Sequence, residues 1–154
     1  MLSLLEEKRV ACLIYSGDQL LHSSASIGVK PLLEFMERYP EGSGGKDLVL
    51  IDKVIGKAAL LLSVHLGIRV IHTPVASEAA VAAAKLHQVE LHAATVVPHI
   101  INRERTGLCP LEQSVMETND PEAALVNIRA AIKILMSAKN PTDHGSSDAD
   151  SAAL

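Results

Sequence analysis

The residues of this sequence best suited to bind a ligand are Asp52, Lys53, Gly56 and Lys57, which follow a short apolar run. The run Leu48–Ile51 is typical of a strand covered on both faces, and Val54–Leu66 has the pattern of a helix. Ligands of open α/β sheets collect at the carboxyl ends of strands, and a helix N-terminus there favours anions. The two lysines are four residues apart, so the predicted helix gives them one face. This pattern predicts a phosphate or carboxylate site.

A second candidate centre is Cys109, which precedes Pro110. Proline is favoured at the first helical position, so the pattern predicts a short helix with Cys109 as its N-cap. A thiol at such a position is favoured as thiolate and can be reactive. Glu112, three residues on, could close the cap or act as an acid or base. An unreactive thiol in a plain capping loop is the alternative, and the sequence leaves both open.

Other motifs argue against common chemistries. Gly45-Lys46 precedes a strand and Gly56-Lys57 is followed by Ala58, so neither pair forms a phosphate-binding P-loop. The seven histidines show no metal-ligand spacing, and no Cys-x-x-Cys is present. We therefore expect no metal and no other cofactor. No Gly-x-Ser-x-Gly supports a serine nucleophile either.

Composition narrows the class of protein further. The chain has 154 residues, 2% of them aromatic, and a net charge of −4, so binding to a nucleic-acid polymer is not expected. No apolar run is long enough for a signal peptide or a membrane span. Two cysteines do not make a disulfide framework, which favours a cytoplasmic location with both thiols reduced.

Strand and helix patterns alternate along the chain, after a hairpin signal around Ser16–Asp18. This order predicts a three-layer α/β/α sandwich with a mixed sheet. Residues 1–138 form its single domain, and the polar stretch 139–154 is expected to be a disordered tail. The predicted elements are the hairpin strands Val10–Tyr15 and Leu20–Ser24, a helix from Lys30-Pro31, the strand Leu48–Ile51, the helix Val54–Leu66 closed by Gly67, the strand Ile68–His72, the helix Glu78–His87 capped by Ser77, a strand from Val89, an edge strand or loop Val96–Ile101, and helices from Pro110 and Asp120-Pro121.

Four segments together resemble a small uncharacterised prokaryotic family that carries only a domain-of-unknown-function label and has a cytidine-deaminase-like fold. They are Gly28-Val29-Lys30-Pro31, Asp52-Lys53-Val54-Ile55-Gly56-Lys57-Ala58-Ala59, Ser77-Glu78 and Ile101-Asn102-Arg103-x-x-Thr106-Gly107-x-Cys109-Pro110-x-Glu112. The likeness covers most of the chain, from residue 8 to residue 135.

The resemblance sharpens the expected site. Zinc deaminases carry His/Cys-x-Glu and Pro-Cys-x-x-Cys at the starts of two helices. Here those places hold Gly28–Pro31 and Asp52–Lys57, without zinc ligands or the catalytic glutamate, which implies a zinc-free member of the fold. The candidate ligand-binding residues are Lys30, Asp52, Lys53, Gly56, Lys57, Glu78, Asn102 and Arg103.

Three functions of different classes follow from these residues. The first is binding of a small anionic ligand, nucleotide-like or carboxylated, by Lys30, Lys53 and Lys57, which should converge on one pocket with Cys109 nearby. The second is a cysteine-dependent enzyme for acyl or sulfur transfer, with Cys109 as nucleophile and Glu112 or a lysine as acid or base. The third is a non-catalytic accessory protein or homo-oligomer.

Overall fold

The computed structural model describes residues 2–26, 28–40, 47–100 and 109–138. Its centre is a six-stranded mixed sheet in the order β2-β1-β3-β5-β4, with β6 also pairing with β5. β1 is antiparallel to β2 and β3, whereas β5 is parallel to β3, β4 and β6. The strands are β1 Cys12–Ser16, β2 Gln19–Ser24, β3 Leu48–Asp52, β4 Val54–Ile55, β5 Ile68–Ser77 and β6 Glu90–Val97.

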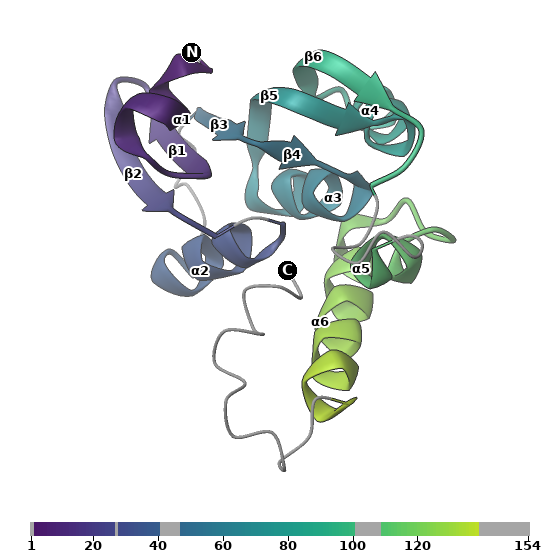
Figure 1. The fold of residues 1–154 in the computed structure, drawn as a ribbon. Coiled ribbons are helices and arrows are strands. Elements are labelled where there is room, and N and C mark those ends of the chain that lie inside the picture. The colour runs from purple at the N-terminus through teal and green to yellow at the C-terminus, as the bar shows by residue number, and fades with distance from the viewer. Residues whose placement is uncertain (1, 27, 41–46, 101–108, 139–154) are drawn as a thin grey trace.

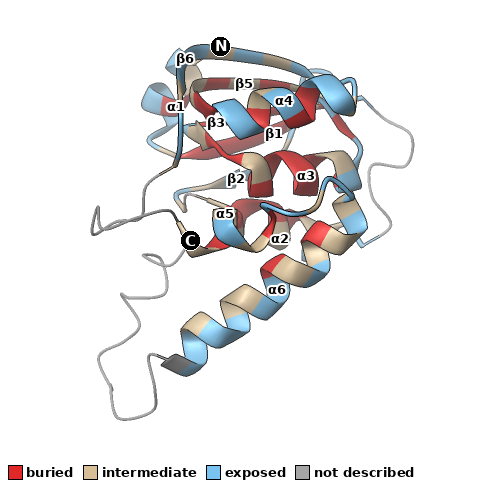
Figure 2. Ribbon diagram, turned by 90° about the vertical axis from the view of Figure 1, so that its right-hand side faces the viewer, coloured by how far each residue is buried: buried red, intermediate tan, exposed pale blue. Residues whose placement is uncertain are grey.

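Helices flank the sheet on both faces, so the predicted three-layer α/β/α sandwich is confirmed (Figure 1). α1 (Ser3–Lys8) lies on one face. On the other lie α2 (Lys30–Arg38), α3 (Lys57–Leu66) and α4 (Glu78–Leu86), while α5 (Pro110–Ser114) and α6 (Pro121–Ala138) pack beyond α3. α3 is therefore enclosed between the sheet and α6, and most of its residues are buried (Figure 2).

Alternation along the strands divides the core between the two faces. Cys12 and Ile14 of β1 pack with Leu50 in the large cluster under α2 and α3. Leu13 and Ile51, which point the other way, form a small cluster with Leu5 of α1. The larger core thus lies on the side that also carries the starts of α3 and α4.

Several predicted helix ends are confirmed. Pro31 lies in the first turn of α2, and Gly67 ends α3 with a φ of 84°. The Ser77 hydroxyl accepts a hydrogen bond from the N–H of Ala80 at 3.1 Å, as expected of an N-cap. Asp120 likewise accepts from the N–H of Ala123 at the start of α6.

The predicted helix Val54–Leu66 is wrong at its beginning. Val54 and Ile55 form the short strand β4, which pairs with Val75 and Ala76 of β5, and α3 begins only at Lys57. Pairing with β5 satisfies backbone groups that a helix would otherwise have to satisfy. Lys53 therefore precedes a strand and does not share a helix face with Lys57.

The last strands are longer than predicted. β5 continues past His72 to Ser77, and the segments from Val89 and Val96 merge into the single strand β6, which follows β5 in parallel register. β6 ends just before Pro98, since proline cannot donate to a ladder. None of the described helices is long and apolar enough to cross a membrane. The predicted tail 139–154 lies outside the described residues.

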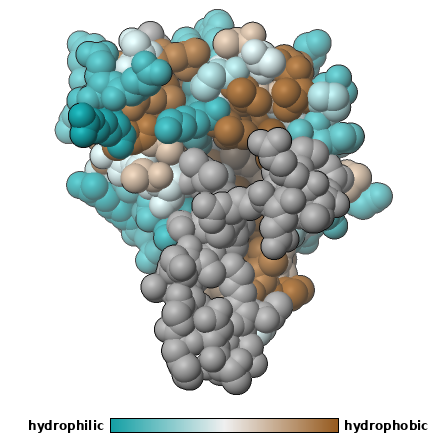
Figure 3. All heavy atoms as spheres, in the orientation of Figure 1, coloured by the Kyte–Doolittle hydropathy of each residue, from teal (hydrophilic) through white to brown (hydrophobic). Residues whose placement is uncertain are grey.

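The apolar face of α6 is only partly covered. Ala124 and Ile128 are fully buried against the core. Leu125, Ile132 and Leu135 are half-buried beside it, but Met136 is exposed. Figure 3 shows a hydrophobic strip over α6.

Candidate functional site

A cavity of about 280 Å³ lies where β5 and β6 end, at the starts of α3 and α4. This is the sheet edge at which open α/β sheets place their ligands. Its volume is just below the roughly 300–1,000 Å³ of drug-sized ligand sites, so it suits a small metabolite. The lining residues are Lys57 from α3, Ser77, Glu78 and Ala79 from the β5–α4 junction, Pro98, His99 and Ile100 after β6, and Glu112 and Met116 from α5 and the turn that follows it.

Glu112 closes the N-terminus of α3. Its Oε1 accepts a hydrogen bond from the backbone N–H of Lys57 at 2.8 Å, and its Oε2 accepts from the N–H of Ala58 at 2.9 Å. The N-cap residue of α3 is Gly56, which has no side-chain oxygen to offer. A carboxylate 54 and 55 residues further along the chain therefore performs the capping. The sequence predicted that Glu112 could cap its own helix. In the structure Glu112 lies in α5, but its carboxylate caps the neighbouring helix α3.

Burial and hydrogen bonding act in opposite directions on Glu112. Burial raises the pKa of its carboxyl group, and the N–H groups of Ala58 and Lys57 together with the Lys57 charge lower it by less. The predicted anion position at the start of α3 is thus already filled by a side chain of the protein. Any ligand anion must bind beside it.

Gly56 leaves room for the close approach of the Glu112 carboxylate. A Cβ atom at position 56 would lie 2.7 Å from Oε1 of Glu112 and closer still to Oε2. The φ of −98° is open to any residue, so the constraint comes from space and not from backbone conformation.

Only one of the three lysines predicted to converge lines the cavity. Lys57 is half-buried, and its Nζ donates a hydrogen bond to the carbonyl of Met116 at 3.3 Å. Lys53 is exposed between β3 and β4, and Lys30 begins α2. Neither is among the lining residues.

Asp52 is fully buried and also lies outside the cavity lining. It ends β3 opposite Cys12 of β1, which is itself opposite Ser24 of β2. Burial raises the pKa of Asp52 well above its usual range, against a smaller lowering by the N–H groups of Lys53 and Val54. Within the described part of the chain, neither carboxylate oxygen has a hydrogen-bond partner of regular geometry. Burial also raises the pKa of Cys12, and Asp52 adds to this effect.

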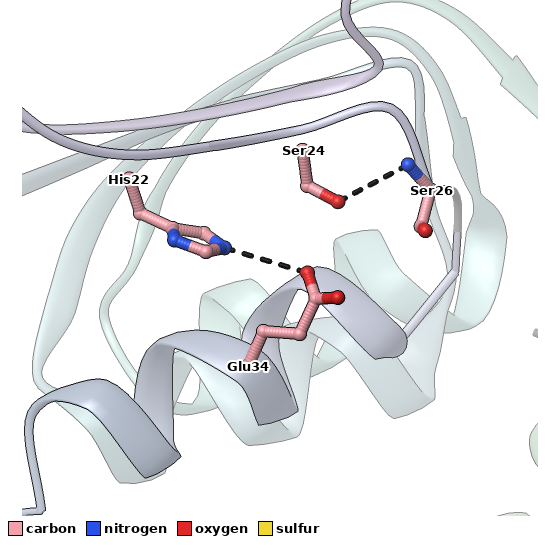
Figure 4. A network of polar contacts seen from close by, with 4 residues as sticks. All are labelled: His22, Ser24, Ser26 and Glu34. Atoms are coloured by element: carbon pink, nitrogen blue, oxygen red, sulfur yellow. Dashed lines mark hydrogen bonds and ion pairs between the residues drawn. The ribbon is translucent and has the colours of Figure 1, made fainter.

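A small set of polar residues lies between β2 and α2 (Figure 4). His22 Nε2 lies 3.5 Å from Glu34 Oε1, and the N–H of Ser26 donates to Ser24 Oγ at 3.1 Å. None of these four residues lines the cavity. Glu34 of α2 therefore belongs to a polar region separate from the cavity.

Cys109 is the N-cap of α5, as predicted, and it is half-buried against the core. Its backbone N–H donates to the carbonyl of Ile100 at 3.1 Å, which holds it next to the segment that borders the cavity. Its side chain is not among the lining residues, and no hydrogen bond described in the structure joins it to Glu112. A catalytic pair of these two residues stays a prediction.

Some predicted and some unpredicted residues remain to be placed. Glu78 lines the cavity, but Asn102 and Arg103 lie outside the described residues. Sequence reasoning did not assign Ser77 or His99 to the site. A sequence signal existed for Ser77, because an N-cap residue directly after a predicted strand marks a helix N-terminus at the ligand-binding edge of a sheet. His99 has no comparable signal in the sequence. Among the described residues, no group of three or more His, Cys, Asp or Glu side chains could hold a metal ion.

The fold and the cavity define a small mixed α/β protein with a candidate ligand site at the carboxyl end of its parallel strands. A family model, TM1506: Domain of unknown function (DUF1893), matches residues 1–132. The chain therefore belongs to the DUF1893 family. It is similar to a crystal structure of a DUF1893 family protein (TM1506) from Thermotoga maritima, with 28% identity, a TM-score of 0.72 and 86% of each chain covered. No curated protein matches the chain.

Proposed function

We propose that this protein binds a small ligand with an anionic group, nucleotide-like or carboxylated, in the cavity between the starts of α3 and α4. The observation that carries the proposal is the presence of Lys57, whose Nζ donates to the carbonyl of the lining residue Met116, and of the first turn of α4 in the lining of one cavity. The first turn of a helix has N–H groups without intrahelical partners, and its partial positive charge favours anions. Lys57 adds a full charge beside it.

Titration with ethyl phosphate, followed by amide chemical shifts, tests this site. The shifts should centre on residues 57 and 77–80. Lys57→Gln should weaken binding roughly tenfold or more, since a hydrogen bond to a charged group contributes about 1.5–3 kcal/mol. Lys53→Gln is the matched control, because it removes the same charge from an exposed position outside the cavity.

The result that contradicts the proposal is equal weakening by Lys53→Gln and Lys57→Gln, which would indicate a general effect of charge. Shifts centred on the β2–α2 region would move the site to Lys30. Absence of binding at millimolar ethyl phosphate would dispose of the anion site altogether.

We further propose that the fold is cytidine-deaminase-like and zinc-free. The support is the order of a hairpin, a helix and then alternating strands and helices around a mixed sheet, together with Gly, Val and Lys residues at the places where deaminases carry zinc ligands. Elemental analysis of purified protein tests the metal, and about one zinc per chain would refute this part of the proposal. A cytoplasmic location is proposed with it, because both cysteines are free.

A further inference from the structure

The charges around the cavity do not match a simple anion. By formal charge, Lys57 contributes +1 and Glu78 and Glu112 contribute −2, so these three lining residues sum to −1. Within the described residues, no ion pair within 4 Å neutralises either glutamate. A phosphate or carboxylate held by Lys57 in about 280 Å³ would therefore also face two carboxyl groups.

We propose that the ligand is zwitterionic, with a phosphate or carboxylate at one end and a protonated amine at the other. This inference rests on the proposed anion site and adds the second half of the ligand. Lys57 and the first turn of α4 would hold the anion, and Glu78 would hold the amine. The carboxylate of Glu78 is exposed at the first residue of α4, on the rim of the same cavity.

Glu112 has a supporting part in the same arrangement. A carboxylate offers about four lone-pair positions, and the N–H groups of Lys57 and Ala58 use two of them. The carboxyl group of this lining residue therefore keeps acceptor capacity while it caps α3. Its two backbone contacts fix the position of this negative group, so the ligand meets a preorganised acceptor.

A glutamate in the first turn of a helix also stabilises the helix dipole without any ligand. The chain offers a comparison for this simpler role, because Glu122 is an exposed first-turn glutamate of α6 that lies outside the cavity. A residue that serves only the dipole should behave like Glu122, whereas a ligand-binding residue should not.

The experiment compares phosphoethanolamine with ethyl phosphate, which has the same phosphate ester and lacks the amine. Amide chemical-shift titrations at low salt give both dissociation constants. We expect phosphoethanolamine to bind at least tenfold more tightly to the native protein. Glu78→Gln should reduce this preference to threefold or less by weakening the binding of phosphoethanolamine itself. Ethyl phosphate should bind the variant as tightly as the native protein or more tightly, because the variant removes a negative charge from the cavity lining. Glu122→Gln should keep the tenfold preference.

Equal affinities of the native protein for the two probes would overturn the zwitterion inference and leave the anion site intact. So would a tenfold preference that survives Glu78→Gln. Failure of both probes to bind would instead remove the proposed anion site itself, so the two failures are distinguishable. Amide spectra of the two variants show whether each is folded before its affinity is compared.

Discussion

Replacing Gly56 with alanine should destabilise the native protein but stabilise a protein in which Glu112 has already been changed to alanine. A methyl group at position 56 would overlap the Glu112 carboxylate. Gly56→Ala therefore forces this carboxylate away from the N–H groups of Lys57 and Ala58. Without the carboxylate the space is open, and the backbone conformation of Gly56 suits alanine.

The magnitude follows from the two hydrogen bonds. Loss of an N-cap side chain costs about 0.5–2 kcal/mol, and the two bonds of Glu112 to backbone N–H groups place it at about 2 kcal/mol. Gly→Ala at a compatible position contributes about 0.4–1 kcal/mol of stability, because it restricts the unfolded chain. Gly56→Ala should thus lower the free energy of unfolding of the native protein by about 1 kcal/mol. In the Glu112→Ala protein it should raise that free energy by about 0.5 kcal/mol.

Urea denaturation of the native protein, both single variants and the double variant measures this coupling directly. Glu117→Ala supplies the control background, because Glu117 is an exposed acidic residue near the end of α5. There the effect of Gly56→Ala should equal its effect in the native protein. If Gly56→Ala has the same sign and size in the Glu112→Ala background, the cap does not constrain position 56 and the reasoning is wrong.

Three further predictions concern titratable and reactive side chains. Asp52→Asn should stabilise the protein at pH 7, because it removes a buried carboxyl group whose ionised form is disfavoured by burial. Because burial raises the folded-state pKa of Asp52, native stability should fall as pH rises above about 4, and urea titrations from pH 4 to 8 should show this slope disappear in the variant. Burial and the neighbouring His92 lower the pKa of His72, and the centroids of the two stacked rings lie 4.7 Å apart. Because the unfolded chain then binds protons more readily than the folded protein, stability should fall as pH drops below about 6.5. Thermal unfolding at pH 5 and 7.5 should show a smaller difference for His72→Gln, and an unchanged difference would exclude this residue as its source. Iodoacetamide should modify half-buried Cys109 in the folded protein and fully buried Cys12 only on unfolding, and peptide mass spectrometry that finds the reverse order would contradict the described burial.

Local patterns determined most elements of the fold before any tertiary contact was known. The apolar run at β3, the turn residues of the hairpin and the helix signals at Pro31, Ser77 and Asp120 act over a few residues, so they are visible in the sequence. Alternation of strands and helices was enough to predict the layered mixed sheet.

The site depended on contacts between distant segments. Val54 and Ile55 pair with β5 and belong to the sheet, so α3 begins at Lys57 and not at Val54 as predicted. Lys57 therefore does not share a helix with Lys53. The sequence marked Gly56, Lys57, Glu78 and Glu112 as candidates. It could not show that the Glu112 carboxylate caps α3, a helix that begins 55 residues earlier in the chain. Nor could it show that Asp52 is buried away from the cavity. Periodicity and caps are set by neighbours along the chain, whereas the charge balance of a cavity is set by which distant side chains the packed fold brings to its wall.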